Sequence, residues 1–188
     1  MELPSPQPVA PPASRPLDSA AGRQRLRVGL HGLRVTAVLF GLYALLFHVS
    51  VVRGNSMAPS IHDGDRILVA PWSLYLSQVE RGDVVVLRYP LDPRLDYIKR
   101  VVGLPGDEVL LAGGRLWVNG TEVLEPYVEE QDPESFVRTR VQAGHYFVLG
   151  DNRRRSSDSR EFGQVPADHL RGVVDLRLWP ISRVGPID

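Results

Sequence analysis

One serine and one lysine are the side chains of this sequence best suited to covalent chemistry. Ser56 lies in GNSMAPS, residues 54–60, and Lys99 lies in LDYIKRVVGLPGD, residues 95–107. A serine hydroxyl becomes a good nucleophile when a neighbouring base takes its proton, and lysine is such a base only when uncharged. Ser56 is therefore the candidate nucleophile and Lys99 the candidate base. The alternatives are an ordinary surface serine and a strand lysine whose amine reaches water.

Lys99 is the only lysine in the chain, because every other Lys or Arg position is arginine. Arginine stays protonated at physiological pH, whereas burial can make a lysine neutral. In a strand, Lys99 shares one face with Tyr97 and Val101, so its amine stands among apolar and aromatic groups. We expect desolvation to lower its pKa from about 10.4 to roughly 7 or 8, at a cost of about 4 kcal/mol of stability at low pH.

A third segment, GDNRRRSSDSREFG at residues 150–163, is too polar for a packed strand and is predicted to be a loop whose side chains bond to one another. Its three consecutive arginines, residues 153–155, could be a patch for nucleic acid. A local network of ion pairs with Asp151, Asp158 and Glu161 is the simpler interpretation. We expect no nucleic-acid partner.

Composition excludes several classes of function. The 188 residues are 43% hydrophobic, which suffices for one domain with a core, and the formal net charge is zero. Such a balance does not indicate an acidic polymer as partner. The absence of cysteine excludes disulfides, thiolate metal sites and cysteine catalysis. No metal or other cofactor is expected.

The N-terminal part predicts a tail and a membrane anchor. Residues 1–34 begin with a stretch rich in Pro, Ala and Ser and are expected to be a disordered cytoplasmic tail. Residues 35–52, VTAVLFGLYALLFHVSVV, carry no charge and would span about 27 Å as a helix. A buried helix or a cleavable secretion signal fits this run less well than a transmembrane helix. The arginines at positions 23, 25, 27 and 34, just before it, place the N-terminus in the cytoplasm and residues 53–188 outside.

Residues 53–188 have the pattern of an all-β domain, with short apolar runs separated by Gly, Pro and Asp. The Asn119-Gly120 pair predicts a hairpin with a type I′ turn, and Gly113-Gly114 a second hairpin. The predicted strands are Arg66 to Ala70, Asp83 to Tyr89, Tyr97 to Val102, Glu108 to Leu111, Arg115 to Val118, Thr121 to Leu124, His145 to Leu149 and Val173 to Trp179.

Taken in order behind an apolar segment, SMAPS, YIKRVVGLPGD and GDNRRRSSDSR resemble the motifs of type I signal peptidases, the S26 family of Ser/Lys peptidases. The resemblance implies a mostly β, antiparallel peptidase core with a smaller insert at about residues 108–143. It implies a membrane-bound endopeptidase that cuts signal peptides from exported preproteins after small residues in an A-x-A-like pattern. Ser56 would be the nucleophile and Lys99 the general base. The protein would lie in the cell membrane with its catalytic domain on the outer face.

The same resemblance assigns supporting roles. Ser156 lies where the family has a hydroxyl that orients the lysine, and Asp158 and Arg160 match a structural ion pair. Asp151 would pair with Arg100, which strand alternation puts on the face opposite the lysine.

Two expectations concern the substrate. Some family members carry, at the position of Gly54, a serine that helps to hold the oxyanion; here that donor is absent and the backbone N–H of Ser56 remains. The expected walls of shallow, apolar substrate pockets are Met57, Ile61, Tyr97 and Ile98.

Three other functions remain to be weighed. A self-cleaving repressor-type protein shares Ser/Lys chemistry but carries an N-terminal DNA-binding domain, for which this sequence has no counterpart. A Ser/His/Asp hydrolase would need His62, His145 or His169 as base, and none of them lies in a supporting motif. The third alternative is a catalytically silent binding module tethered to a membrane, which the presence of both Ser56 and Lys99 argues against.

Overall fold

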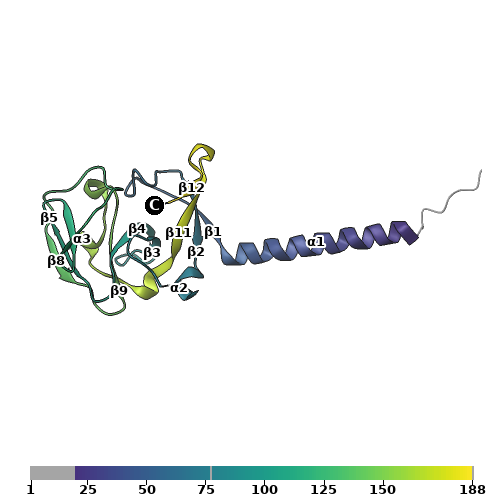
Figure 1. Cartoon of the computed structure of the whole chain (residues 1–188), viewed down its shortest axis with the longest axis horizontal. Helices are drawn as coiled ribbons and strands as arrows, with labels where there is room; N and C mark the ends of the chain where they lie inside the picture. Colours follow the sequence, from purple (N-terminus) through teal and green to yellow (C-terminus); the bar gives the residue numbers. More distant parts are fainter. Residues whose placement is uncertain (1–19, 77, 188) are drawn as a thin grey trace, which may run out of the picture. The chain divides into compact units, whose positions relative to one another are not determined.

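The computed structural model describes residues 20–76 and 78–187, and the chain divides into two compact units, residues 1–43 and 44–188 (Figure 1). The first unit contains most of helix α1, Ala20–Leu46. The second unit contains all the strands. Each unit is described by itself below.

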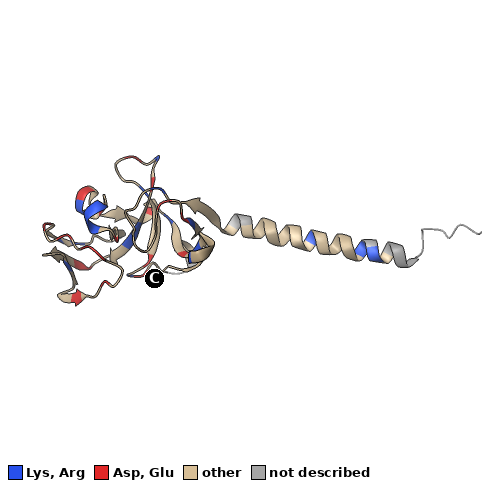
Figure 2. Cartoon of the chain, turned by 90° about the horizontal axis from the view of Figure 1, so that it is seen from above, with Lys and Arg blue, Asp and Glu red and all other residues tan. Residues whose placement is uncertain are grey.

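Helix α1 begins earlier in the chain than the sequence pattern indicates. Residues 20–34 are helical, so the prediction of a disordered tail through residue 34 is wrong for this stretch, and residues 1–19 lie outside the described part. The cause is a run of Ala, Arg, Gln and Leu, which are strong helix formers, after the last proline of the N-terminal segment. Arginines occur only in the first part of the helix, before Val35 (Figure 2).

The helix also ends earlier than predicted, so a continuous helix over residues 35–52 is wrong. Strand β1, His48–Val51, pairs antiparallel with β2, Arg66–Ala70. Its β-branched valines favour an extended strand, where neighbouring backbone can satisfy their N–H and C=O groups. In the described residues, no helix combines the length and apolar character needed to cross a membrane.

The larger sheet is antiparallel throughout. Its strands follow the order β1-β2-β11-β3-β4-β9-β10, and β12 pairs with β11. The bounds not yet given are β3 Val84–Arg88, β4 Asp96–Gly103, β9 His145–Leu149, β10 Val165–Pro166, β11 Leu170–Trp179 and β12 Gly185–Pro186.

A smaller antiparallel sheet of order β7-β6-β5-β8 is formed by the stretch that the resemblance marks as an insert. Its strands are β5 Glu108–Ala112, β6 Arg115–Val118, β7 Thr121–Val123 and β8 Val137–Arg140. Both predicted hairpins are confirmed. Asn119 and Gly120 have φ of 52° and 80°, and Gly113 and Gly114 have φ of 56° and 79°, as a type I′ turn requires.

Short helices complete the second unit: α2 Ser73–Leu76, α3 Ser159–Phe162, and the 3₁₀ turns η1 Arg153–Arg155, η2 Ala167–His169 and η3 Ile181–Arg183. Each predicted strand is present within three residues of its expected bounds. The sequence did not predict β1, β8, β10 or β12. These are either very short or, like β8 with its sequence VRTR, carry few apolar side chains.

Strand β3 is apolar on both faces and lies between two parts of the core. Val84 and Val86 pack in a cluster with the chain around Met57, while Val85 and Leu87 pack in a second cluster with residues of β4, β9 and β11. Because both faces are covered, the alternating polar pattern of a half-exposed strand is absent. This buried strand is the neighbour of β4, and Val85 lies in register with Lys99.

Candidate active site

Ser56 lies in the loop between β1 and β2, and hydrogen bonds within this loop fix its shape. The Gly54 N–H donates to Asp63 Oδ1 at 2.7 Å, and the Asp63 N–H donates to Asn55 Oδ1 at 3.2 Å. Gly54 has φ of 90°, which favours glycine. From the other side, the Asn152 N–H donates to the carbonyl of Ser56 at 3.1 Å. The nucleophile candidate is therefore held by two segments far apart in sequence.

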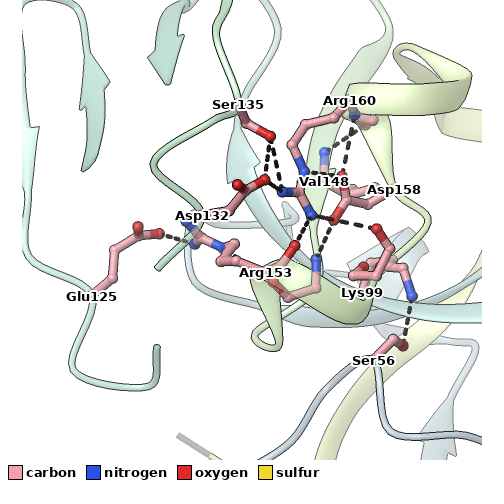
Figure 3. Close-up of polar contacts among 12 residues, drawn as sticks. Ser56, Lys99, Glu125, Asp132, Ser135, Val148, Arg153, Asp158 and Arg160 are labelled. Atoms are coloured by element: carbon pink, nitrogen blue, oxygen red, sulfur yellow. Dashed lines mark hydrogen bonds and ion pairs between the residues drawn. The ribbon is translucent and has the colours of Figure 1, made fainter. Parts of the chain in front are cut away.

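Lys99 projects from the part of β4 that pairs with β3 alone, since pairing of β4 with β9 begins at Arg100. Its Nζ lies 2.8 Å from Ser56 Oγ and 2.9 Å from the carbonyl oxygen of Ile98 (Figure 3). The residue is only 3% exposed. The Nζ also lies 5.2 Å from the centre of the Tyr97 ring, as the expected strand alternation requires.

Burial lowers the pKa of Lys99 from 10.5 to about 8. The carboxylates of Asp158 and Asp151 act against this effect because they stabilise the ammonium form, whereas the positive charge of Arg160 lowers the pKa further. No carboxylate forms an ion pair with the amine in the described residues. The amine can therefore release its proton near neutral pH, which an exposed lysine cannot do.

The three histidines considered as alternative bases have other partners. His62 Nδ1 lies 2.7 Å from Arg183, His145 Nδ1 lies 3.0 Å from the carbonyl of Ala143, and His169 Nδ1 lies 3.3 Å from that of Arg88. The side chain hydrogen-bonded to Ser56 Oγ is Lys99. The arrangement favours a Ser/Lys pair over a Ser/His/Asp triad.

Arg100 and Asp151 form a buried ion pair, as strand alternation and the resemblance led us to expect. The Arg100 Nε and Nη2 donate to the two carboxylate oxygens at 2.9 and 2.8 Å. The ring of Tyr127 covers the guanidinium at 4.0 Å. This two-pronged bond ties β4, one residue from Lys99, to the polar loop at residues 150–163.

Asp158 and Arg160 form a second two-pronged pair inside that loop. The Arg160 Nε and Nη2 donate to Asp158 Oδ1 and Oδ2, each at 2.8 Å. Asp158 is fully buried and also accepts a hydrogen bond from the Gly150 N–H at 3.0 Å. It caps α3 as well, because its Oδ1 accepts from the backbone N–H of Arg160. The carboxylate thus fixes the loop at three points.

Ser156 does not donate a hydrogen bond to Lys99. Its Oγ is buried and has no hydrogen-bond partner among the described residues. The hydroxyl instead lies against Gly150, where an added Cβ would stand 2.1 Å from Ser156 Oγ and 2.5 Å from the backbone oxygen of Ser56. The expected hydrogen bond from Ser156 to Lys99 is therefore absent. Ser156 Oγ and the Ser56 backbone oxygen nevertheless both lie beside Gly150.

Sequence reasoning missed Gly150, which allows this close approach. Its only signal was a glycine directly before Asp151 and Asn152, at the end of the apolar strand β9. Any side chain here would collide with the loop that carries Ser56, because the nearest neighbours include backbone atoms, which cannot rotate away.

The expected pairing of the three arginines at residues 153–155 with nearby carboxylates is wrong. Arg153 forms an ion pair with Glu125 at 2.5 Å, and the Arg154 Nε donates to the carbonyl of Gln131 at 3.3 Å. The local carboxylates are unavailable because Arg100 and Arg160 already occupy Asp151 and Asp158. Sequence distance concealed these partners, which lie between β7 and β8.

A groove of about 570 Å³ opens beside Ser56 and Lys99. Of the four residues predicted to form substrate pockets, Tyr97 and Ile98 line this groove. Met57 and Ile61 do not: they are 1% and 0% exposed and belong to the core. The expectation that these two residues form pocket walls is wrong, because the turn that joins them, closed by the Ile61 N–H donating to the Met57 carbonyl, directs both side chains into the core.

Comparison with known proteins gives one consistent family. The family model described as "Signal peptidase, peptidase S26" matches residues 25–179. Signal peptidase I of Leptolyngbya laminosa is 32% identical over 195 residues, covering 99% of this chain and 96% of that protein. Signal peptidase I of Bacillus licheniformis is 35% identical over 167 residues, covering 82% and 89%.

Among solved structures, a signal peptidase I from Enterococcus faecalis V583 is similar, with 32% identity and a TM-score of 0.47 over 52% of this chain and 97% of that chain. The match of the family model over well more than half of the chain, together with relatives above 30% identity along most of their length, decides the assignment. The chain belongs to the signal peptidase family, peptidase S26, and is a serine peptidase.

Proposed function

We propose that this chain removes N-terminal signal peptides from exported preproteins with Ser56 as nucleophile and Lys99 as general base. The observation that carries the proposal is the 2.8 Å contact between Lys99 Nζ and Ser56 Oγ, made by a residue that is only 3% exposed and whose pKa is lowered to about 8. Proximity alone would leave a protonated lysine, which cannot accept a proton. Burial supplies the neutral form.

Two acyl-transfer steps follow from this geometry. Neutral Lys99 accepts the proton of Ser56 Oγ while the oxygen attacks the scissile carbonyl carbon, and the carbonyl oxygen becomes negative. The Lys99 ammonium then gives this proton to the departing amine as the carbon–nitrogen bond breaks, which leaves an ester on Ser56. A water molecule that loses a proton to Lys99 attacks the ester, and Ser56 recovers its proton as the signal peptide leaves.

Backbone groups stabilise the negative oxygen in this mechanism. Among the described residues, nothing accepts a hydrogen bond from the Ser56 N–H, so this donor is available to the substrate. Gly54 has no hydroxyl to add a second donor, and its own N–H is engaged by Asp63. A donor aimed at the developing charge lowers the barrier by about 3 to 4 kcal/mol.

The substrate binds in the groove as an extended chain. Strand β4 pairs only with β3 from Asp96 to Lys99, so among the described residues its other edge has no strand partner there. An extended peptide can add to such an edge through main-chain hydrogen bonds. Tyr97 and Ile98 line the groove at this edge and would leave room only for small side chains near the scissile bond.

The supporting residues act by holding the pair in place. The Arg100–Asp151 and Asp158–Arg160 ion pairs fix β4 and the loop that packs against Ser56. Ser156 joins this group through its buried hydroxyl, which has no hydrogen-bond partner among the described residues and would bond to Lys99 in the substrate complex. Catalytic hydrogen bonds are often long in a substrate-free site and tighten when the substrate binds.

The protein is also held at a membrane, with its N-terminus in the cytoplasm. Residues 35–43 of α1 expose large apolar side chains, among them Val38, Leu39 and Phe40, each at least 60% exposed. The arginines precede this segment, which agrees with the positive-inside tendency. A membrane anchor would raise the local concentration of substrates whose apolar stretch lies in the same bilayer.

Ser56→Ala and Lys99→Arg should each abolish cleavage of a preprotein while the folded state persists. The first removes the nucleophile, and the second replaces the base by a guanidinium that cannot be deprotonated. Cleavage of one radiolabelled preprotein on gels, with circular dichroism as the check on folding, measures both. Ser182→Ala, which changes an exposed serine in η3, is the matched control and should keep full activity. Normal cleavage by Lys99→Arg would exclude Lys99 as base.

The pH dependence of activity should follow the titration of Lys99. Because its pKa is lowered to about 8, the neutral form increases as pH rises through 8, and kcat/KM should rise with it and then level off. Labelling the protein with ¹³C-lysine gives a single side-chain signal, since the chain has one lysine. This signal should titrate near pH 8, and it should be missing from Lys99→Arg. A midpoint near 10.5 would contradict the proposed base.

Ser156→Ala should lower kcat, but less than Ser56→Ala does, because it removes a group that orients the base rather than a reacting atom. Single-turnover rates of peptide cleavage would measure the effect. Ser157→Ala, the neighbouring serine that lines the groove, is the comparison for loss of a hydroxyl alone. Rates equal to those of the unchanged protein would take Ser156 out of the site.

Membrane attachment should depend on the first compact unit. The full chain should stay with vesicles during alkaline carbonate extraction, whereas residues 44–188 should be released and remain folded. A shorter version that starts after Val52 should be less stable, because it lacks β1 and its pairing with β2. Release of the full chain by carbonate would contradict the anchor.

A further inference from the structure

The connection between β7 and β8, residues 124–136, carries three side chains that bond to the loop at residues 150–160. Glu125 pairs with Arg153, while Asp132 and Ser135 bond to Arg160. Figure 3 shows these groups on one side of the two arginines, with Ser56 and Lys99 on the other. The smaller sheet is therefore linked to the polar loop at residues 150–163 by hydrogen bonds and ion pairs between side chains, in addition to the covalent backbone.

The first link ends at the backbone oxygen of Gly150. Glu125 Oε1 accepts from Arg153 Nη2 at 2.5 Å, and the Nε of the same guanidinium donates to the Gly150 carbonyl at 3.1 Å. Tyr127 also donates to Glu125 Oε1, at 2.9 Å, which fixes the carboxylate. The arginine bridges the connection and the glycine.

The second link ends at the N–H of the same glycine. Asp132 Oδ2 accepts from Arg160 Nη1 at 2.9 Å, and Arg160 holds Asp158 by two hydrogen bonds. Asp158 Oδ2 in turn accepts from the Gly150 N–H at 3.0 Å. Arg160 Nη2 also donates to the carbonyl of Arg153 at 2.7 Å, which joins the two links to each other.

Because both links fix the position of Gly150, they also restrict the position of Ser56, which lies against this glycine. A Cβ at this position would lie 2.5 Å from the Ser56 backbone oxygen, so the two backbones are in direct contact. Two residues later, the Asn152 N–H donates to that same oxygen. A displacement of Gly150 would therefore move Ser56 relative to Lys99 Nζ, which lies 2.8 Å away from Ser56 Oγ.

The first link depends on a buried charge. The side chains of Arg153 and Glu125 are 1% and 8% exposed, and Arg153 Nη1 is buried with no hydrogen-bond partner among the described residues. Removal of Glu125 would leave a guanidinium in the interior without a counter-charge, a situation that proteins relieve by moving the group towards water. Such a movement of Arg153 would release the Gly150 carbonyl.

Resting on the function proposed above, we infer that residues 124–136 form a clamp that positions Ser56 against Lys99, with Glu125 and Asp132 as its positioning residues. The clamp acts through Arg153, Arg160 and Asp158 on the two backbone groups of Gly150. The role of the smaller sheet is then to hold residues 124–136 against the polar loop at residues 150–163. Neither carboxylate touches the substrate or the reacting atoms.

Glu125→Ala tests the inference in the full-length protein. A misplacement on the order of 1 Å lowers the rate by up to about 100-fold, so kcat for a signal-peptide substrate should fall 10- to about 100-fold while KM changes little. Glu125→Gln keeps an acceptor for Arg153 and should recover part of the rate. Asp132→Ala breaks the second link at a more exposed pair and serves if Glu125→Ala does not fold.

Two control variants separate positioning from stability. Glu108→Ala removes an exposed ion pair to Arg138 in the same sheet and should leave kcat unchanged. Leu116→Ala opens a cavity in the core of that sheet, where the side chain is 1% exposed, and lowers the melting temperature without touching the clamp. The clamp predicts that kcat of Glu125→Ala lies well below that of Leu116→Ala at equal loss of thermal stability.

The single lysine signal supplies a readout that loss of stability alone would not change. The charged groups that act on Lys99 are Asp151, Asp158, Arg160 and Glu161, and burial is the largest cause of its low pKa. Loosening the clamp should admit water, so the midpoint of the lysine titration should rise towards 10.5 in Glu125→Ala. In Glu108→Ala it should stay near 8.

The outcomes distinguish this inference from the function on which it rests. Full cleavage by Ser56→Ala overturns both. Loss of cleavage in Ser56→Ala together with unchanged kcat in Glu125→Ala and Asp132→Ala overturns the clamp alone. A fall in kcat that Leu116→Ala reproduces at the same melting temperature also overturns it, because stability then explains the effect.

Discussion

The burial of one amine is the constraint on which the rest of the site depends. The pKa of Lys99 is lowered from 10.5 to about 8, so the unfolded chain binds this proton more tightly than the native state does. Below pH 8 this difference lowers the stability of the native state by roughly 3 kcal/mol. The native state therefore gains stability relative to the unfolded chain as pH rises from 8 to 10.5. A carboxylate salt-bridged to the amine would remove this cost, but it would also keep the proposed base protonated. The carboxylates of Asp151 and Asp158 must therefore lie close enough to hold the backbone around Lys99, but they must pair with arginines and not with the amine.

Strand β4 meets both requirements by alternation. Lys99 lies where the strand has no second neighbour, so its amine reaches the Ser56 loop, while Arg100 lies where pairing with β9 begins and its guanidinium holds Asp151 on the opposite face. Neighbouring residues thus divide two tasks: Lys99 has an amine that loses its charge as pH rises through about 8, and Arg100 holds the loop through its guanidinium. The same loop that receives Arg100 brings Gly150 against Ser56, so the strand and the loop are aligned by one set of contacts.

Much of this arrangement could be predicted from the sequence. The strands were visible because apolar runs alternate with turn residues, and the single lysine in an apolar strand indicated a perturbed amine. What could not be predicted depends on tertiary contacts. The uncharged segment at residues 35–52 could form a helix or a strand, and only pairing with β2 makes its last part, β1, a strand. Met57 has an apolar side chain that would suit the wall of a groove as well as the core, so the sequence alone could not decide between them. Glu125 is 28 residues from Arg153 in sequence, and local pairing for that arginine was plausible until Asp151 and Asp158 proved to be occupied.

The use of arginine in every structural ion pair of the site has one more consequence. The cation of each of these pairs, at Arg100, Arg153 and Arg160, is a guanidinium, a group that proteins do not deprotonate. The electrostatic background around Lys99 is then constant while that residue changes charge. Lys99, the proposed base, can therefore gain or lose its proton without a loss of the arginine ion pairs that define the geometry of the site.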